Sequence, residues 1–194
     1  MSNQTPRPRL RTLDLTYIAL SAVLITVCSW ISIPAAVPFT LQTFAVFFAL
    51  LVLDGRRGTL AVLVYLLMGA VGLPVFAGFK GGLGSLLGVT GGYILGFLAT
   101  ALIFWAVTHF AGSSLPVSVA ACVVGLACCY AFGTIWFVQV YTANVKPIGL
   151  GAALGMCVIP YIVPDLLKLA LAVLLSRRLK KYLQVNCQTK CNRK

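Results

Sequence analysis

Long apolar runs separated by short polar breaks account for most of the sequence. The apolar segments lie near residues 14–33, 39–53, 58–73, 88–111, 116–140 and 148–176. Most of them reach the length of about 20 residues at which an α-helix crosses a bilayer, and the two segments of about 15 residues need tilt or longer ends. The pattern predicts an all-α integral membrane protein, one membrane domain with six transmembrane helices.

The basic residues are distributed unevenly around these predicted spans. Only Lys80 and Lys146 fall in loops on one side. Because cytoplasmic loops are enriched in Lys and Arg, the opposite side is expected to be cytoplasmic. Both termini then lie in the cytoplasm, with 177–194 as a basic cytoplasmic tail. The residues on that side are Arg7, Arg9, Arg11, Arg56, Arg57, Arg177, Arg178, Lys180, Lys181, Lys190, Arg193 and Lys194.

The composition supports a membrane protein and argues against a nucleic-acid-binding one. The chain is 60% hydrophobic and 9% charged, whereas a soluble domain carries about 25% charged residues. The net charge of +12 arises from residues that flank the spans. Such charges orient the protein and attract anionic lipid headgroups, so the bilayer is the expected partner and nucleic acid is not.

Asp165 and Lys168 are the charged residues in the interior of a predicted span. Their i, i+3 spacing places both on one face of a helix, which we expect to restart at Pro164. Charges inside a membrane are costly and usually functional. A ligand site, a proton relay through Asp165 and an ion pair that only holds the span in place all remain open.

The segment "KGGLGSLLGVTGGYILGF", residues 80–97, is unusually rich in glycine. Gly84, Gly88, Gly92 and Gly96 recur at every fourth position, which in a helix gives a stripe suited to close helix packing. The alternative is backbone that lines a cavity for a small solute. The spacing fits no phosphate-binding loop, so ATP binding by this chain is not expected.

The start of the second span and one face of the first carry further polar or small residues. Gln42 and Thr43 offer hydrogen bonds to a solute or to neighbouring helices. On the first span, Ala19, Ala22, Thr26 and Ser29 share a face that suits either a partner subunit or this chain's own helices. His109 is the only histidine and no G-x-S-x-G occurs, so an enzyme is not expected.

Several motifs together resemble the biotin-transporter S components, the BioY family of energy-coupling-factor (ECF) transporters. The resemblance runs from about Ile33 to Phe97, through LQT, GLPVFAG and TGGY, and resumes at "PYIVPDLLKLALAVLL", with its D-x-x-K pair. Two positions depart from the family's pattern. Val89 replaces the usual Pro of GPTGG, and Val163-Pro164 replaces Pro-Gly before the Asp.

The resemblance implies a six-helix subunit of a prokaryotic plasma membrane that captures biotin from outside. A transmembrane T subunit and two cytoplasmic ATPases are the implied partners, so this chain needs no cofactor and ATP binds to the partners. Ala19, Ala22 and Thr26 then form the docking face on the first helix. The alternative is a stand-alone secondary transporter with Asp165 as proton relay. The implied biotin-binding residues are Asp165, Lys168, Gly91, Gly92, Tyr93, Gln42, Thr43, Phe39 and Phe79.

Overall fold

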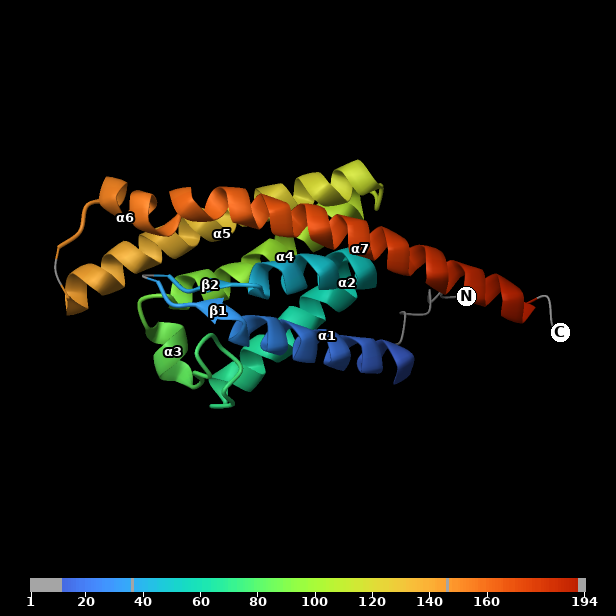
Figure 1. Cartoon of the computed structure of the whole chain (residues 1–194), viewed down its shortest axis with the longest axis horizontal. Coiled ribbons are helices and arrows are strands. Elements are labelled where there is room, and N and C mark those ends of the chain that lie inside the picture. The colour runs from blue at the N-terminus through green and yellow to red at the C-terminus, as the bar shows by residue number, and fades with distance from the viewer. Residues whose placement is uncertain (1–11, 36, 146, 192–194) are drawn as a thin grey trace, which may run out of the picture.

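The computed structural model describes residues 12–35, 37–145 and 147–191, with side chains to residue 181. The charges predicted to orient the chain at Arg7, Arg9, Arg11, Lys146, Lys190, Arg193 and Lys194 lie outside the described residues or side chains. The chain is mostly helical, as predicted (Figure 1). Its elements are α1 (Thr12–Trp30), β1 (Ser32–Ile33), β2 (Phe39–Thr40), α2 (Gln42–Ala70), α3 (Leu83–Leu87), α4 (Gly91–Ala111), α5 (Leu115–Asn144), α6 (Leu150–Cys157) and α7 (Ile159–Cys191).

The helix α2 folds back on itself at Asp54, whose φ of 70° and ψ of 171° are not helical. A straight helix would hold Gln42 and Tyr65 about 35 Å apart, yet the Gln42 Nε2 lies 2.9 Å from the Tyr65 hydroxyl. A Cβ added to Gly58 would lie 2.9 Å from the Leu50 Cα, so the two limbs meet closely. The limbs correspond to the apolar runs predicted at 39–53 and 58–73.

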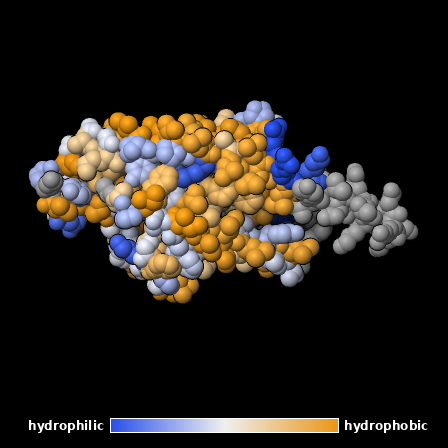
Figure 2. All heavy atoms as spheres, viewed as in Figure 1, coloured by the Kyte–Doolittle hydropathy of each residue, from blue (hydrophilic) through white to orange (hydrophobic). Residues whose placement is uncertain are grey.

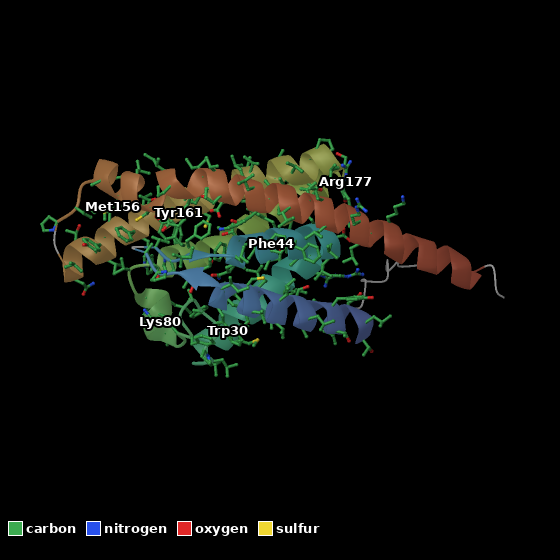
Figure 3. The ribbon with its side chains drawn as sticks, viewed as in Figure 1. Trp30, Phe44, Lys80, Met156, Tyr161 and Arg177 are labelled. Atoms are coloured by element: carbon green, nitrogen blue, oxygen red, sulfur yellow. The ribbon has the colours of Figure 1, made fainter. Side chains whose placement is uncertain are left out.

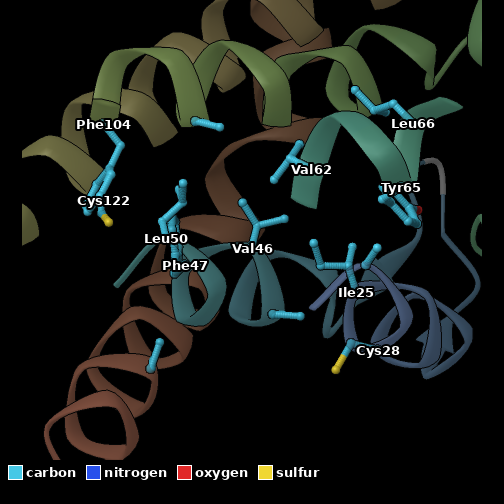
Figure 4. Close-up of a cluster of buried hydrophobic side chains, with 14 of the residues drawn as sticks. Ile25, Cys28, Val46, Phe47, Leu50, Val62, Tyr65, Leu66, Phe104 and Cys122 are labelled. Atoms are coloured by element: carbon cyan, nitrogen blue, oxygen red, sulfur yellow. The ribbon is translucent and has the colours of Figure 1, made fainter. Parts of the chain in front are cut away.

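The core lies between α1, both limbs of α2, α4, α5 and α7. In Figure 4 the side chains of Val46, Leu50 and Val62 from the two limbs face the interior together with Ile25 of α1. All four are fully buried. Small residues alternate with these larger ones, and Ala22, Ala45 and Ala61 are also fully buried, which lets the helices approach closely.

Helices α4 and α5 pack through glycines on both sides of their contact. A Cβ on Gly92 would lie 2.3 Å from the Trp136 Cβ, and a Cβ on Gly125 would lie 2.7 Å from the Thr100 Cγ2. The Thr100 hydroxyl donates to the Gly125 carbonyl at 2.9 Å. At such distances a side chain could be added only if the facing helix shifted, so each glycine favours the close approach of that helix.

The predicted glycine stripe is confirmed only in its second half. Gly92 and Gly96 lie on α4 and contact α5. Helix α3 ends at Leu87, and the backbone of Gly88 is extended. A Cβ on Gly84 would meet nothing within 4 Å. The four glycines therefore do not share one helix face, since the chain changes direction between α3 and α4.

Short elements that the sequence did not predict separately gather at one end of the bundle. The hairpin β1–β2 pairs Ser32 with Thr40 and Ile33 with Phe39. With α3 and α6 it lies at the end opposite the start of α1 and the end of α7 (Figure 1). At that other end, Arg57 pairs with Asp14 at 3.2 Å and Lys180 with Asp54 at 3.7 Å.

The break in the last predicted span occurs at Val158, between α6 and α7. The expectation that the helix restarts at Pro164 is wrong, because α7 begins at Ile159 and contains Pro164. Pro160 is the second residue of α7, where the missing N–H costs no helical hydrogen bond. The helix therefore begins five residues earlier than predicted.

The described residues contain four segments long and apolar enough to cross a membrane: α1, α4, α5 and the combined stretch Leu150–Lys181. Each limb of α2 is shorter than 18 residues. Large apolar side chains are exposed on several helices, among them Leu20, Leu102, Ile135 and Leu167. Figure 2 shows hydrophobic side chains over much of one face, with hydrophilic ones more frequent toward its ends. This surface is suited to lipid.

The glycine contacts predict a stability difference between two equivalent substitutions. Gly125→Ala should lower the free energy of unfolding by about 1–3 kcal/mol, because the new methyl overlaps Thr100. Gly151→Ala meets open space in α6 and should be neutral or stabilise by up to about 1 kcal/mol. Unfolding followed in detergent tests this, and equal losses for both variants would contradict the packing account.

Candidate functional site

A cavity lies between the start of α2, α4, α5, the α6–α7 break and α7, at the end that carries the hairpin. Its lining is mainly apolar and aromatic, with a few polar groups directed into it. In Figure 3, Tyr161 marks the part of α7 that borders it. The lining residues used below are Gln42, Thr43, Thr90, Tyr93, Phe97, Cys129, Tyr130, Tyr161, Asp165 and Lys168.

The two charged side chains of this cavity form an ion pair. The Lys168 Nζ lies 2.8 Å from the Asp165 Oδ1, and the Tyr130 hydroxyl donates to the Asp165 Oδ2 at 2.5 Å. Asp165 is 4% exposed and Lys168 7%. The Lys168 Nζ also lies 4.0 Å from the centroid of the Phe39 ring, within reach of a cation–π interaction. Both carboxylate oxygens thus have a partner within the chain.

The hairpin is attached to the same region of α7. The Tyr161 hydroxyl donates a short hydrogen bond to the Val37 carbonyl in the turn between β1 and β2. The rings of Phe39 and Tyr161 lie 6.0 Å apart. The β1–β2 turn therefore borders the cavity through Val37 and Pro38, and Phe39 at the start of β2 lies against the Lys168 cation.

Hydrogen bonds hold the other polar groups in place. The Gln42 side chain donates to the Tyr65 hydroxyl, which donates to the Val75 carbonyl at 3.2 Å. The Tyr93 and Thr134 hydroxyls are 3.0 Å apart. Because buried polar groups fix orientation when they are fully paired, these contacts give the cavity a defined shape.

Six of the nine predicted ligand residues are brought together here. Five line the cavity: Gln42, Thr43, Tyr93, Asp165 and Lys168. Phe39 contacts Lys168. Nothing in the geometry tests what they bind, so their roles stay predictions. The arrangement can accept hydrogen bonds at a carboxylate, donate them from an ammonium and enclose a flat, partly apolar molecule.

Gly91 and Gly92 stand beside the cavity at the start of α4 rather than in its lining. A Cβ on Gly91 would lie 1.7 Å from the Leu86 carbonyl oxygen, and a Cβ on Gly92 would overlap Trp136. The Trp136 Nε1 in turn donates to the Gly88 carbonyl at 3.0 Å. These glycines let α3 and α5 close against α4, and this contact sets the position of Tyr93.

Phe79 lies away from the cavity. Its side chain is 64% exposed, and its ring stacks on Trp30 with centroids 5.0 Å apart. The Trp30 Nε1 donates to the Pro74 carbonyl, which ties α1 to this loop. In this conformation Phe79 covers the end of α1, and a part in ligand binding stays a prediction.

Tyr130 and Tyr161 were not predicted from the sequence. Tyr130 lies in an apolar span without a distinctive motif, and its hydroxyl was the one available signal, because a phenol at membrane depth needs a partner. Tyr161 lies next to Pro160, and its link to the hairpin spans more than 120 positions. Spacing alone cannot reveal such a contact.

The predicted docking face of α1 is divided between the interior and the surface. Ala22 is fully buried and Thr26 is 6% exposed. The Thr26 hydroxyl donates to the Ala22 carbonyl. Ala22 and Thr26 therefore face the chain's own core rather than a partner, because small residues let α1 approach α2. Ala19 is exposed, and its docking role stays a prediction.

A second cavity adjoins the first and shares Pro38, Ala77, Thr90 and Ile94 with it. Lys80 and Ser85 also line this cavity, so it carries a cation near the end of the bundle. Among the described residues, no three His, Cys, Asp or Glu side chains come together as metal ligands would.

Comparison with known proteins identifies the family. The model of the BioY family matches residues 1–185. The chain belongs to the BioY family. The biotin transporter BioY of Thermotoga maritima is 43% identical over 159 residues, 81% of this chain and 90% of that protein. The probable biotin transporter BioY of Pyrococcus horikoshii is 37% identical over 169 residues, 86% and 96% of the two chains.

The fold is similar to that of a solved BioY-type structure. The crystal structure of the S-component for biotin from an ECF-type ABC transporter matches with a TM-score of 0.77 and 26% identity. The match covers 89% of this chain and 95% of the other. Val89 and Val163, which depart from the family pattern, lie outside the lining of the first cavity, and Val163 is 66% exposed.

The ion pair predicts an order of stabilities among three variants. Lys168→Met leaves the Asp165 carboxylate buried without its cation and should lower the free energy of unfolding by about 3–5 kcal/mol. Asp165→Leu/Lys168→Met removes both charges and should be more stable than Lys168→Met. Tyr130→Phe should cost about 1.5–3 kcal/mol, the contribution of one hydrogen bond to a charged group. Unfolding in detergent gives the order, and a double variant less stable than Lys168→Met would contradict it.

Proposed function

We propose that this chain is the biotin-binding S component of an ECF-type transporter, which captures biotin outside and delivers it inward. The observation that carries the proposal is the buried Asp165–Lys168 pair in a largely apolar, aromatic cavity of a BioY-family chain. The names of the relatives support the same ligand.

The chemistry of the cavity suits the parts of biotin. The ureido ring has two N–H donors and a carbonyl, and each Asp165 oxygen keeps a free lone pair beside its present partner. We expect the ureido N–H groups to donate to Asp165 and an oxygen of the ligand to accept from Lys168. Tyr93 and Phe39 supply apolar walls, and Gln42 and Thr43 supply further hydrogen bonds.

The proposed topology has six transmembrane helices, with both termini in the cytoplasm. The two limbs of α2 count as separate spans, since Gln42 and Tyr65 meet at the same level. Arg57, Arg177, Arg178, Lys180 and Lys181 then lie at the cytoplasmic end, as basic loop residues do. The hairpin and the cavity lie at the outer end, from which biotin enters.

The proposed partners are a transmembrane T subunit and two cytoplasmic ATPases. Ala19 is exposed on α1 with Leu20 and Val23. This outward face, rather than Ala22 and Thr26, is the part of α1 available to a partner. ATP is then bound by the ATPases, and this chain contributes ligand capture without a cofactor or a catalytic group.

Biotin affinity measured by calorimetry on the purified chain tests the assignment. The chain should bind one biotin without ATP. Asp165→Asn should weaken binding about ten- to a hundredfold, because it removes a charged acceptor. The matched control is Asp54→Asn, the same chemical change at an exposed carboxylate remote from the cavity, which should not alter the affinity.

Two outcomes would contradict the proposal. A chain that binds another vitamin but not biotin would refute the substrate. A folded Asp165→Leu/Lys168→Met variant with near-normal biotin affinity would show that the pair does not contact the ligand.

Measurements of energised uptake distinguish α1 residues that dock a partner from α1 residues that are needed for folding. Ala19→Trp should fold and bind biotin normally but reduce uptake at least tenfold in cells that contain the T subunit and ATPases, because a bulky ring prevents close helix approach. Ala22→Trp should instead fail to fold, since Ala22 is fully buried. Uptake that persists when the ATPases are inactivated would favour the stand-alone transporter, with Asp165 as proton relay.

A further inference from the structure

A third cavity lies at the opposite end of the bundle from the ligand cavity. It is bounded by residues 176–181 of α7, the first turns of α5, the α4–α5 connection and the first limb of α2. Figure 3 labels Arg177, which projects from α7 at this place. The lining residues are Leu51, Ser113, Leu115, Ser118, Ser176, Arg177, Lys180 and Lys181.

Three cations meet in this cavity with little acid to neutralise them. The sequence contains three acidic residues, Asp14, Asp54 and Asp165. Among the described side chains, only Lys180 of the three cations pairs with one, at 3.7 Å from the exposed Asp54. Arg177 and Lys181 form no ion pair with any of the three aspartates in this conformation. A positive cavity without internal anions is suited to an anion from outside.

Other groups in the cavity also favour the binding of an anion. The 30-residue helix α5 begins at Leu115, and its N-cap residue Ser114 makes no side-chain capping hydrogen bond. The partial positive charge of the helix terminus therefore adds to the three cations. Ser113 contributes a hydroxyl, a donor that phosphate oxygens accept.

The surroundings of the cavity indicate a lipid rather than a free ion. Leu171, Leu174 and Leu175 are 47%, 60% and 43% exposed on α7, and the basic run begins directly after them. Phe110, at the end of α4, is 86% exposed. Leu51 and Leu115 form an apolar wall within the cavity itself. The cations thus lie where a lipid-facing surface ends, which is the level of the phosphates of a bilayer.

We infer that this cavity binds the headgroup of an anionic phospholipid, with the phosphate between Arg177 and Lys181 and the acyl chains along the exposed leucines of α7. Arginine and lysine supply charge-assisted hydrogen bonds to phosphate oxygens. The inference is independent of what the outer cavity binds. A bound lipid would link α5, α7 and the turn of α2 at the end where Asp54 and Lys180 already meet.

Lipid binding to the purified full chain, measured by native mass spectrometry from detergent, tests this inference. The chain should retain one phosphatidylglycerol in preference to phosphatidylcholine. Arg177→Gln and Lys181→Gln should each weaken phosphatidylglycerol binding about fivefold. Arg178→Gln is the matched control, because this substitution removes the same charge from the same exposed turn. Arg178 does not line the cavity. Arg178→Gln should therefore leave the affinity unchanged.

Each contrary outcome has a distinct meaning. Equal binding of the two lipids, or an equal loss in Arg178→Gln, would overturn the site in favour of unspecific surface charge. Displacement of the lipid by millimolar inorganic phosphate, with the same dependence on Arg177, would show a free-anion site and overturn the lipid assignment. Normal lipid binding with lost association to ATPase-containing partners in Arg177→Gln would assign the cations to a protein interface and also overturn it. Thermal unfolding of each variant confirms that it is folded.

Discussion

A charge at membrane depth must be neutralised and hydrogen-bonded, and the arrangement around Asp165 follows from that requirement. Lys168 supplies the opposite charge from the next turn of α7, but a pair alone leaves one carboxylate oxygen unsatisfied. Tyr130 of α5 donates to that oxygen, and Phe39 of the hairpin covers the ammonium. The pair thus fixes the positions of three separate parts of the chain. These are α7, α5 and the β1–β2 hairpin, and their relative positions determine the shape of the cavity beside the pair.

The glycines complete this arrangement by letting backbones approach one another. Helix α5, which carries Tyr130, lies close to α4, and that closeness depends on positions such as Gly96, where a Cβ would lie 2.6 Å from the Cys129 Sγ. On α5, Gly133 likewise leaves room for the ring of Tyr93 on α4. The glycine-rich segment therefore acts mainly through helix packing, and it shapes the cavity without lining most of it.

The sequence was informative where one residue type has one physical consequence. Asp165 and Lys168 were predictable because charge inside an apolar run has few explanations, and the apolar runs anticipated even the limbs of α2. Long-range pairing was not predictable. Nothing local indicates that Tyr161 bonds to Val37, that Phe79 stacks on Trp30, or that Ala22 faces inward. The start of α7 was misplaced because Pro160 and Pro164 offer equally good first-turn positions, and the local sequence does not distinguish them.

The neutrality of the Asp165–Lys168 pair has an electrical consequence. An elementary charge moved through a membrane potential of 100 mV changes energy by about 2.3 kcal/mol, so a lone buried charge would be pulled by the field of an energised cell. Opposite charges 2.8 Å apart carry no net charge and present the field with only a small dipole. The cavity beside the pair therefore keeps the same geometry whether or not the membrane is polarised. Voltage can act on a charged solute that enters this cavity, but hardly on the paired residues that line it.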